Sequence, residues 1–219
     1  MPAATEYCPF CSELMDPSLF CRVQQGWPFA SRIVHLNRRA FVIPGIGPQV
    51  YPYLLVLTRR HKFSLASTTR DERHDLVASL DWLRQTGIYP SPTLTVFEHG
   101  GCGGNDSASC VDHAHLHVVD GRFGIQTLFA AYAATTSVAF GAETPLPQME
   151  RYVFAGSYDG SGVIRGELAE GVFPKQFCRR LLATIVGGPW NWRLKMHEEW
   201  VLRTVTELGS RKAESLTGA

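Results

Sequence analysis

The segment from Cys110 to Asp120, CVDHAHLHVVD, constrains the fold more than any other part of the 219-residue chain. It places histidines at positions 113, 115 and 117, and an apolar residue follows each of them. Residues two apart on an extended strand project to the same face, about 6.6 Å from one another. Three buried imidazoles would each need partners for a donor and an acceptor. The pattern therefore predicts a strand with one packed face and one face available for chemistry.

Three interpretations of this histidine row are open. The histidines could hold a structural metal ion, they could be exposed by chance, or they could take part in catalysis. The regular apolar residues between them argue against chance, because such alternation is typical of a half-buried strand. We favour catalysis, and a hydrolase that uses all three histidines as metal ligands stays as a further alternative.

The hydrophobic pattern of the rest of the chain predicts a mixture of strands and helices. The long segment 67–86 opens with Ser and Thr capping candidates and spaces Leu76, Leu80 and Leu83 along one face, which predicts a helix. Further helices are expected over about 121–135, after Pro174 and over 195–208. Strands are expected over 33–43, 51–57, 94–97, 110–120, 152–155 and 162–167.

Composition limits the classes of function. The formal charge is +1 and only 19% of residues are charged, so no DNA or RNA partner is expected. No leader pattern and no apolar run of roughly 18–20 residues is visible, which predicts a cytoplasmic protein without a membrane anchor. Without an export signal, six cysteines favour metal or redox chemistry over disulfides.

Cys8 and Cys11 form a CPFC motif near the N-terminus. Two cysteines at this spacing suit one corner of a tetrahedral zinc site. The competing interpretation is a thioredoxin-like redox pair, but that motif belongs at a strand-to-helix junction within a βαβ unit. We favour zinc.

The run His-Ala-His-Leu-His-Val-Val resembles the signature of the histidine triad (HIT) superfamily, in which histidines alternate with apolar residues. The resemblance covers roughly residues 8–122. It implies a nucleotide hydrolase or nucleotidyltransferase that acts on an α-phosphate. It also implies that His115 is the nucleophile that forms a nucleotidyl-histidine intermediate, and that His117 positions or neutralises the phosphate oxygens. Backbone N–H groups of the 100–110 loop would hold the phosphates.

The resemblance also implies further site residues. Ser109 and Cys110 occupy the place where relatives often have Gln-Ser. Glu98 and His99 are expected to contact ribose or substrate or to close a turn. Zinc-bearing members use a CxxC pair, a later histidine and the first triad histidine. The corresponding metal ligands here are Cys8, Cys11, His61 and His113, with His99 as a rival fourth ligand. Zinc in this role is structural.

Two features depart from the family pattern. Pro52-Tyr53 stands where many members have Gly-His, so Tyr53 is expected to pack or to donate its hydroxyl. The altered segment before the triad keeps open a catalytically inactive, zinc-stabilised nucleotide-binding or regulatory protein. Beyond residue 122 no signature is visible. A helix expected in this part of the chain carries Gln176, Arg179 and Arg180. These side chains either bind a phosphate or carboxylate or form a solvated helix face, and we favour the solvated face.

The resulting expectation is an α+β fold, with a HIT-like antiparallel sheet of about five strands, a long packed helix and a C-terminal helical extension. Residues 1–122 would form the catalytic core with its zinc knuckle, and residues 123–219 an extension packed on it. A nucleotide or nucleotide conjugate is the expected substrate, and a homodimer is possible.

Overall fold

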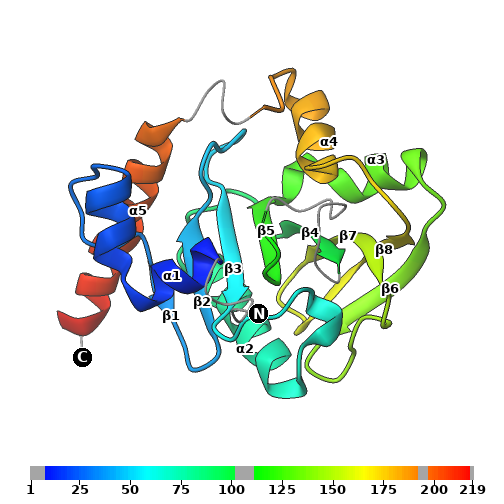
Figure 1. Cartoon of the computed structure of the whole chain (residues 1–219), viewed down its shortest axis with the longest axis horizontal. Coiled ribbons are helices and arrows are strands. Elements are labelled where there is room, and N and C mark those ends of the chain that lie inside the picture. Colours follow the sequence, from blue (N-terminus) through cyan, green and yellow to red (C-terminus); the bar gives the residue numbers. More distant parts are fainter. Residues whose placement is uncertain (1–7, 102–110, 192–196, 218–219) are drawn as a thin grey trace, which may run out of the picture.

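A single antiparallel sheet organises the computed structural model, which describes residues 8–101, 111–191 and 197–217. The eight strands of this part of the chain run in the order β1-β2-β3-β5-β4-β7-β8-β6, and every neighbouring pair is antiparallel. Helices pack against both faces of the sheet (Figure 1). The α+β class expected from the sequence is confirmed.

The N-terminal half of the sheet comes from the strands that the sequence pattern indicated. They are β1 (His35–Leu36), β2 (Ala40–Pro44), β3 (Leu54–Thr58), β4 (Leu94–Gly101) and β5 (His115–Asp120). The single strand expected over 33–43 is instead a hairpin of β1 and β2. The Asn37 side-chain oxygen accepts hydrogen bonds from the backbone N–H groups of Arg39 and Ala40, which turns the chain there.

The C-terminal half adds three strands, β6 (Thr136–Gly141), β7 (Arg151–Tyr158) and β8 (Val163–Glu170). The described ranges therefore hold eight strands where about five were expected, although β7 and β8 cover the strands expected over 152–155 and 162–167. β7 pairs with β4 along all eight of its residues, from Arg151 opposite Gly101 to Tyr158 opposite Leu94. The sheet thus continues across residue 122.

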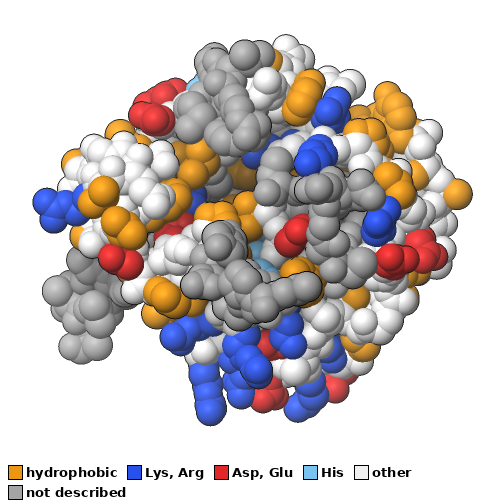
Figure 2. Space-filling view, in the orientation of Figure 1, with side chains coloured by type: hydrophobic (Ala, Val, Ile, Leu, Met, Phe, Trp, Pro, Cys, Tyr) orange, Lys and Arg blue, Asp and Glu red, His pale blue; other side chains and the backbone are white. Residues whose placement is uncertain are grey.

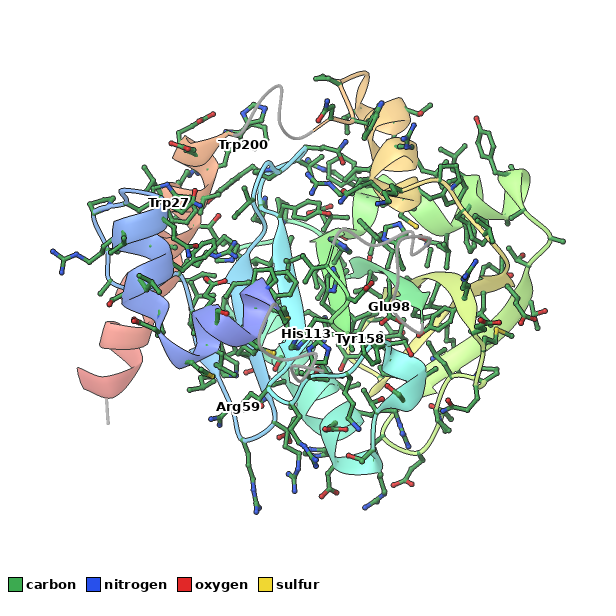
Figure 3. The ribbon with its side chains drawn as sticks, viewed as in Figure 1. Trp27, Arg59, Glu98, His113, Tyr158 and Trp200 are labelled. Carbon is green, nitrogen blue, oxygen red and sulfur yellow. The ribbon has the colours of Figure 1, made fainter. Side chains whose placement is uncertain are left out.

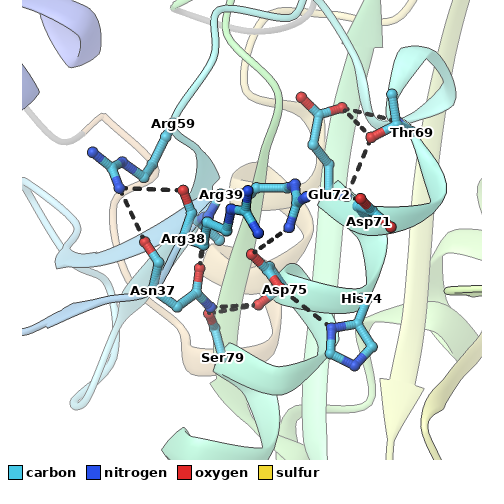
Figure 4. A network of polar contacts seen from close by, with 11 residues as sticks. Asn37, Arg38, Arg39, Arg59, Thr69, Asp71, Glu72, His74, Asp75 and Ser79 are labelled. Carbon is cyan, nitrogen blue, oxygen red and sulfur yellow. Dashed lines mark hydrogen bonds and ion pairs between the residues drawn. The ribbon is translucent and has the colours of Figure 1, made fainter.

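Helix α2 (Arg70–Gln85) covers one face of the sheet, as the sequence predicted. Thr69 and Glu72 form a capping box at its N-terminus, in which each side chain accepts from the backbone N–H of the other. The Asn37 amide donates to the Asp75 carbonyl and to Ser79, and Arg39 bonds Asp71, so the β1–β2 hairpin is tied to α2 (Figure 4). Arginines and lysines gather along the same edge of the molecule (Figure 2).

The opposite face of the sheet carries a second apolar cluster, formed with α1 (Pro9–Met15), α3 (Ile125–Tyr132) and α4 (Phe177–Val186). A short π-helical segment η2 (Leu19–Gln24) and α5 (Glu198–Thr217) pack together through Trp27 and Val201. Short 3-10 turns lie at η3 (Leu65–Ser67) and η4 (Gly121–Phe123). In the described ranges, no helix has the length and apolar character needed to cross a membrane.

Candidate functional site

Strand β5 lies between β3 and β4, and it presents His115 and His117 to the face covered by α1 and α4. Leu116 and Val118 point to the other face and belong to the core under α2. The alternation inferred from the sequence is thus present. His113 comes two residues before the strand begins, whereas the sequence pattern had placed it on the strand. All three imidazoles are nearly removed from solvent, with exposures of 2%, 5% and 6%.

A chain of hydrogen bonds fixes the orientation of the two catalytic candidates. Nδ1 of His115 lies 2.5 Å from the His113 carbonyl oxygen, and its Nε2 lies 3.1 Å from Nε2 of His117. The carbonyl oxygen can only accept, so Nδ1 of His115 carries the proton and Nε2 carries the lone pair. His117 must then donate through Nε2, which leaves its Nδ1 to accept from the hydroxyl of Tyr53 at 2.7 Å.

Burial keeps these rings uncharged. It lowers the pKa of His115, and the hydrogen bond to the His113 carbonyl opposes part of that shift. Burial also holds the pKa of His117 well below its usual value, and the positive charge of Arg179 acts in the same direction. A neutral imidazole with a free lone pair is the form that can act as a nucleophile.

A cavity of about 170 Å³ opens in front of His115 and His117. That volume is many times the roughly 10–15 Å³ that a single water needs on the same measure. Residues from distant parts of the chain line it: Pro9, Phe10, Phe20, Arg32, Ile46, Leu55, His99, Val111, His115, His117, Gln176 and Arg179. Figure 2 shows pale blue histidine atoms beside apolar side chains near the centre of the face in view.

An aromatic side chain packs against each of the two catalytic candidates. The ring of Phe97 stacks on His117 with their centroids 4.6 Å apart, and the ring of Phe10 meets His115 edge-on at 5.5 Å. His99 also lines the cavity, where its Nε2 accepts from the backbone N–H of Cys178 at 2.9 Å. Burial lowers the pKa of His99 to about 3, so this ring is neutral as well.

Four side chains beside the triad form a group that could bind a metal ion. Their ligand atoms all lie within 4.8 Å of one another, and they come from Cys8, Cys11, His61 and His113. Nδ1 of His113 lies 3.3 Å from the sulfur of Cys8 and 3.6 Å from that of Cys11, while Nδ1 of His61 lies 3.5 Å from Cys11. His115, His117 and His99 are outside this group.

These distances suit a tetrahedral ion with two sulfur and two nitrogen ligands. A zinc ion with Zn–S of about 2.3 Å and Zn–N of about 2.0–2.1 Å holds its sulfur and nitrogen ligands roughly 3.6 Å apart. Nε2 of His113 lies 2.7 Å from the Thr58 carbonyl oxygen, which leaves Nδ1 unprotonated and directed at the two sulfurs. Burial and the nearby Cys8 raise the pKa of Cys11 to about 12, so a bound cation is needed to hold its thiolate.

Other residues proposed from the sequence lie elsewhere. Glu98 is on β4, next to His99 in the chain (Figure 3), but it does not line the cavity, and its partners belong to the core cluster under α2. There its carboxyl group accepts from the Leu65 N–H at 2.8 Å and from the Tyr152 hydroxyl. Ser109 and Cys110 lie outside the described residues.

The structure also brings to the cavity residues that the sequence did not single out or that we had assigned to a solvated helix face. Arg32 lines it and forms a buried ion pair with Glu13, at 2.6 Å between Nε and Oε1. Gln176 and Arg179, which we favoured as part of a solvated helix face, line the cavity instead, and both are buried. No motif marks any of these residues, because each meets the triad only through the tertiary fold.

No protein-family model matches the chain, and no curated protein matches it in sequence. Among solved structures, a hypothetical protein from Leishmania major shares 19% identity and a TM-score of 0.37, over 52% of this chain and 73% of that one. A HIT family hydrolase from Clostridium thermocellum is 16% identical with a TM-score of 0.32, over 53% of this chain and 91% of the hydrolase. Yeast Ap4A phosphorylase in complex with AMP is 15% identical with a TM-score of 0.36, over 62% of this chain and 58% of the phosphorylase. Likeness at this level establishes neither family nor activity for this chain.

Proposed function

We propose that the chain is a HIT-type nucleotide hydrolase or nucleotidyltransferase that cleaves at the α-phosphate of a nucleoside-monophosphate conjugate. The observation that carries the proposal is the orientation of His115, whose Nδ1 is tied to the His113 carbonyl while Nε2 faces the cavity. Nε2 therefore has a lone pair to present to a phosphorus atom, and the N–H of His117 lies beside it. The bond that is cleaved is a phosphoric anhydride or a phosphoramidate.

In the proposed reaction, Nε2 of His115 bonds to phosphorus as the bond from phosphorus to the leaving group breaks. The leaving group departs with the electron pair of that bond, and the amine of a phosphoramidate takes a proton from solvent as it leaves. The N–H of His117 turns from His115 to a phosphoryl oxygen, where charge accumulates in the transition state. In hydrolysis, water then attacks phosphorus, the N–P bond breaks with its electron pair returning to Nε2, and the proton lost by water passes to solvent.

In the same proposal, Cys8, Cys11, His61 and His113 hold a zinc ion, for which their interatomic distances are suited. The ion would be structural and would use all four ligands, so it would join the N-terminal segment to His113, two residues before β5, without activating water. Phe10 lies between the two cysteines and contacts His115, so the clamp also shapes the cavity. A metal-dependent hydrolase that uses all three triad histidines as ligands does not fit, because His115 and His117 are outside the metal group.

Turnover of a substrate panel tests the proposal. The purified protein is incubated with nucleoside 5′-phosphoramidates, dinucleoside polyphosphates and other nucleotide conjugates of several bases, and the released nucleoside monophosphate is measured. We expect release by the wild type, loss of release in His115→Ala and normal release in His74→Ala, whose side chain is exposed on α2. Nucleotide binding without release would instead favour the inactive binding or regulatory protein.

Several predictions from the sequence belong to this proposal and rest on sequence alone. They are the cytoplasmic location, the lack of a DNA or RNA partner, the possible homodimer and the division of the chain at residue 122. Product analysis with phosphate or an alcohol as acceptor separates hydrolysis from phosphorolysis and nucleotidyl transfer.

A further inference from the structure

Arg179 is a buried cation on the wall of the catalytic cavity. It lies in the first turn of α4, its exposure is 5%, and it lines the same cavity as His115 and His117. Its guanidinium carbon lies 5.3 Å from the centre of the Tyr53 ring. His99 and His117 line the same cavity, and the positive charge of Arg179 contributes to lowering the pKa values of both.

The guanidinium of Arg179 lacks a counter-charge in the described part of the chain. Its terminal nitrogens donate to the carbonyl oxygens of Ile46, at 3.5 Å, and Gly47. Its Nε is buried with no hydrogen-bond partner among the described residues, and no carboxylate of those residues lies within ion-pair distance. Burial of a cation without a paired anion is costly. The contacts with neutral carbonyl oxygens offset only part of that cost.

The other arginine that lines the cavity differs from Arg179, because it is paired with a carboxylate. Arg32 forms a two-point ion pair with Glu13, at 2.6 Å from Nε to Oε1 and 2.8 Å from Nη2 to Oε2. The charge of Arg32 is therefore neutralised within the protein. Arg179 keeps its charge for a ligand that enters the cavity. Burial holds three titratable groups near it neutral, because it lowers the pKa values of His99 and His117 and raises that of Tyr53.

The chemistry of the proposed substrate identifies that ligand group. The α-phosphate has to lie in front of His115, and a nucleoside carries no further charge. A second anion in a nucleoside-monophosphate conjugate can therefore come only from the leaving group. We propose that Arg179 forms a subsite for an acidic leaving group, the next phosphate of a phosphoanhydride. This inference rests on the proposed function and narrows its substrates from phosphoramidates with neutral leaving groups to nucleoside di- and polyphosphate conjugates.

A matched pair of substrates tests this subsite. The kcat/KM values of the protein are compared for a nucleoside 5′-diphosphate and for the 5′-phosphoramidate of the same nucleoside with an uncharged amine as leaving group. Charge-assisted hydrogen bonds to a phosphate imply that Arg179→Gln lowers kcat/KM for the diphosphate by about 10- to 100-fold more than for the phosphoramidate. Arg179→Lys should recover part of the preference, because it restores the charge.

Arg180 provides the matched control, because it follows on the same helix but bonds the Lys175 carbonyl oxygen and stacks on Trp190 outside the cavity. Arg180→Gln should leave both kcat/KM values unchanged. Glutamine at 179 keeps an amide donor for the Gly47 carbonyl oxygen, and the melting temperature of each variant is measured alongside. An equal loss for both substrates in Arg179→Gln would overturn the proposal, because it would assign Arg179 either to the α-phosphate that both substrates share or to holding residues 46–47.

An equilibrium measurement separates failure of this subsite from failure of the proposed chemistry. Inorganic pyrophosphate is titrated into the zinc-loaded wild type, Arg179→Gln and Arg180→Gln, and heat is measured. The subsite predicts binding that weakens by about 10-fold or more only in Arg179→Gln. Such binding together with absent turnover would overturn the catalytic proposal and retain the subsite. Equal affinity in all three proteins would overturn the subsite.

Discussion

The hydroxyl oxygen of Tyr53 lies 2.7 Å from Nδ1 of His117. Tyr53 is the residue immediately before β3, and its hydroxyl determines which nitrogen of His117 carries the proton. Because Tyr53 donates to Nδ1, His117 keeps its N–H on Nε2, next to Nε2 of His115. Burial raises the pKa of Tyr53 further above its usual value, so the hydroxyl stays a donor. Tyr53 is therefore a positioning residue for the triad.

Tyr53→Phe should disturb catalysis through His117. Without the hydroxyl, both tautomers of His117 become accessible, and we expect kcat/KM to fall by about 10-fold, the equivalent of one hydrogen bond. Nitrogen NMR of labelled histidine should show a single Nε2–H tautomer of His117 in the wild type and a mixture in the variant. Tyr51→Phe is the control, since Tyr51 donates to Glu207 away from the cavity. An unchanged His117 tautomer in Tyr53→Phe would refute this role.

Removal of the metal should destabilise the protein before it affects chemistry. Without a cation, the thiol of Cys11 returns to the protonated form, because burial and Cys8 raise its pKa to about 12. We expect a chelator to lower the melting temperature by on the order of 10 °C. Metal analysis should find one zinc per chain in the wild type and none in Cys11→Ser. Cys21→Ala should keep its zinc, since Cys21 is buried outside the group.

The raised pKa of Glu98 should make the free energy of unfolding fall as the pH rises. Burial raises the pKa of Glu98 to about 8 from its ordinary 4.5, so the folded state keeps a proton that the unfolded state releases. The stabilisation is complete below about pH 4.5 and is lost as the pH rises to about 8, at up to about 1.4 kcal/mol per pH unit. Urea unfolding across this window should show that slope in the wild type relative to Glu98→Gln. The exposed Glu143→Gln should preserve the wild-type slope, and parallel curves for wild type and Glu98→Gln would contradict the prediction.

The capping box of α2 should contribute measurably to stability. Thr69→Ala removes the side-chain acceptor for the Glu72 N–H, and such losses lower the free energy of unfolding by about 1 kcal/mol. Chemical denaturation measures the difference. Thr206→Ala is the control, because Thr206 lies on an exposed part of α5 and bonds only a carbonyl of its own helix. An equally small effect of both substitutions would show that the cap is not required.

The sequence was sufficient where local patterns determine structure. The capping residues and leucine spacing of 67–86 predicted α2, and alternation placed His115 and His117 on one face of β5. The CPFC motif and the HIT resemblance led to Cys8, Cys11, His61 and His113, which the fold gathers into one cluster. Each of these inferences depends on spacing within a single element or on a motif.

The sequence was insufficient where long-range pairing decides the outcome. The register that sets Phe97 opposite His117 directs His99 to the cavity and Glu98 away from it, and a strand pattern alone does not reveal which face is which. Strand β6 is half exposed, and its apolar alternation is too weak to mark a strand. Arg179 meets the carbonyl of Gly47 from more than a hundred residues away in the chain, so nothing local identifies it.

Mapping the covalent intermediate tests the central claim most directly. The zinc-loaded protein is mixed with a nucleotide conjugate that the substrate panel identifies, quenched in alkali and digested, and the peptides are analysed by mass spectrometry. The account predicts a nucleoside-monophosphate adduct on His115 that is stable in alkali and lost in acid, as expected for a nitrogen–phosphorus bond. Turnover without any adduct at His115, or with an adduct at another residue, would contradict it.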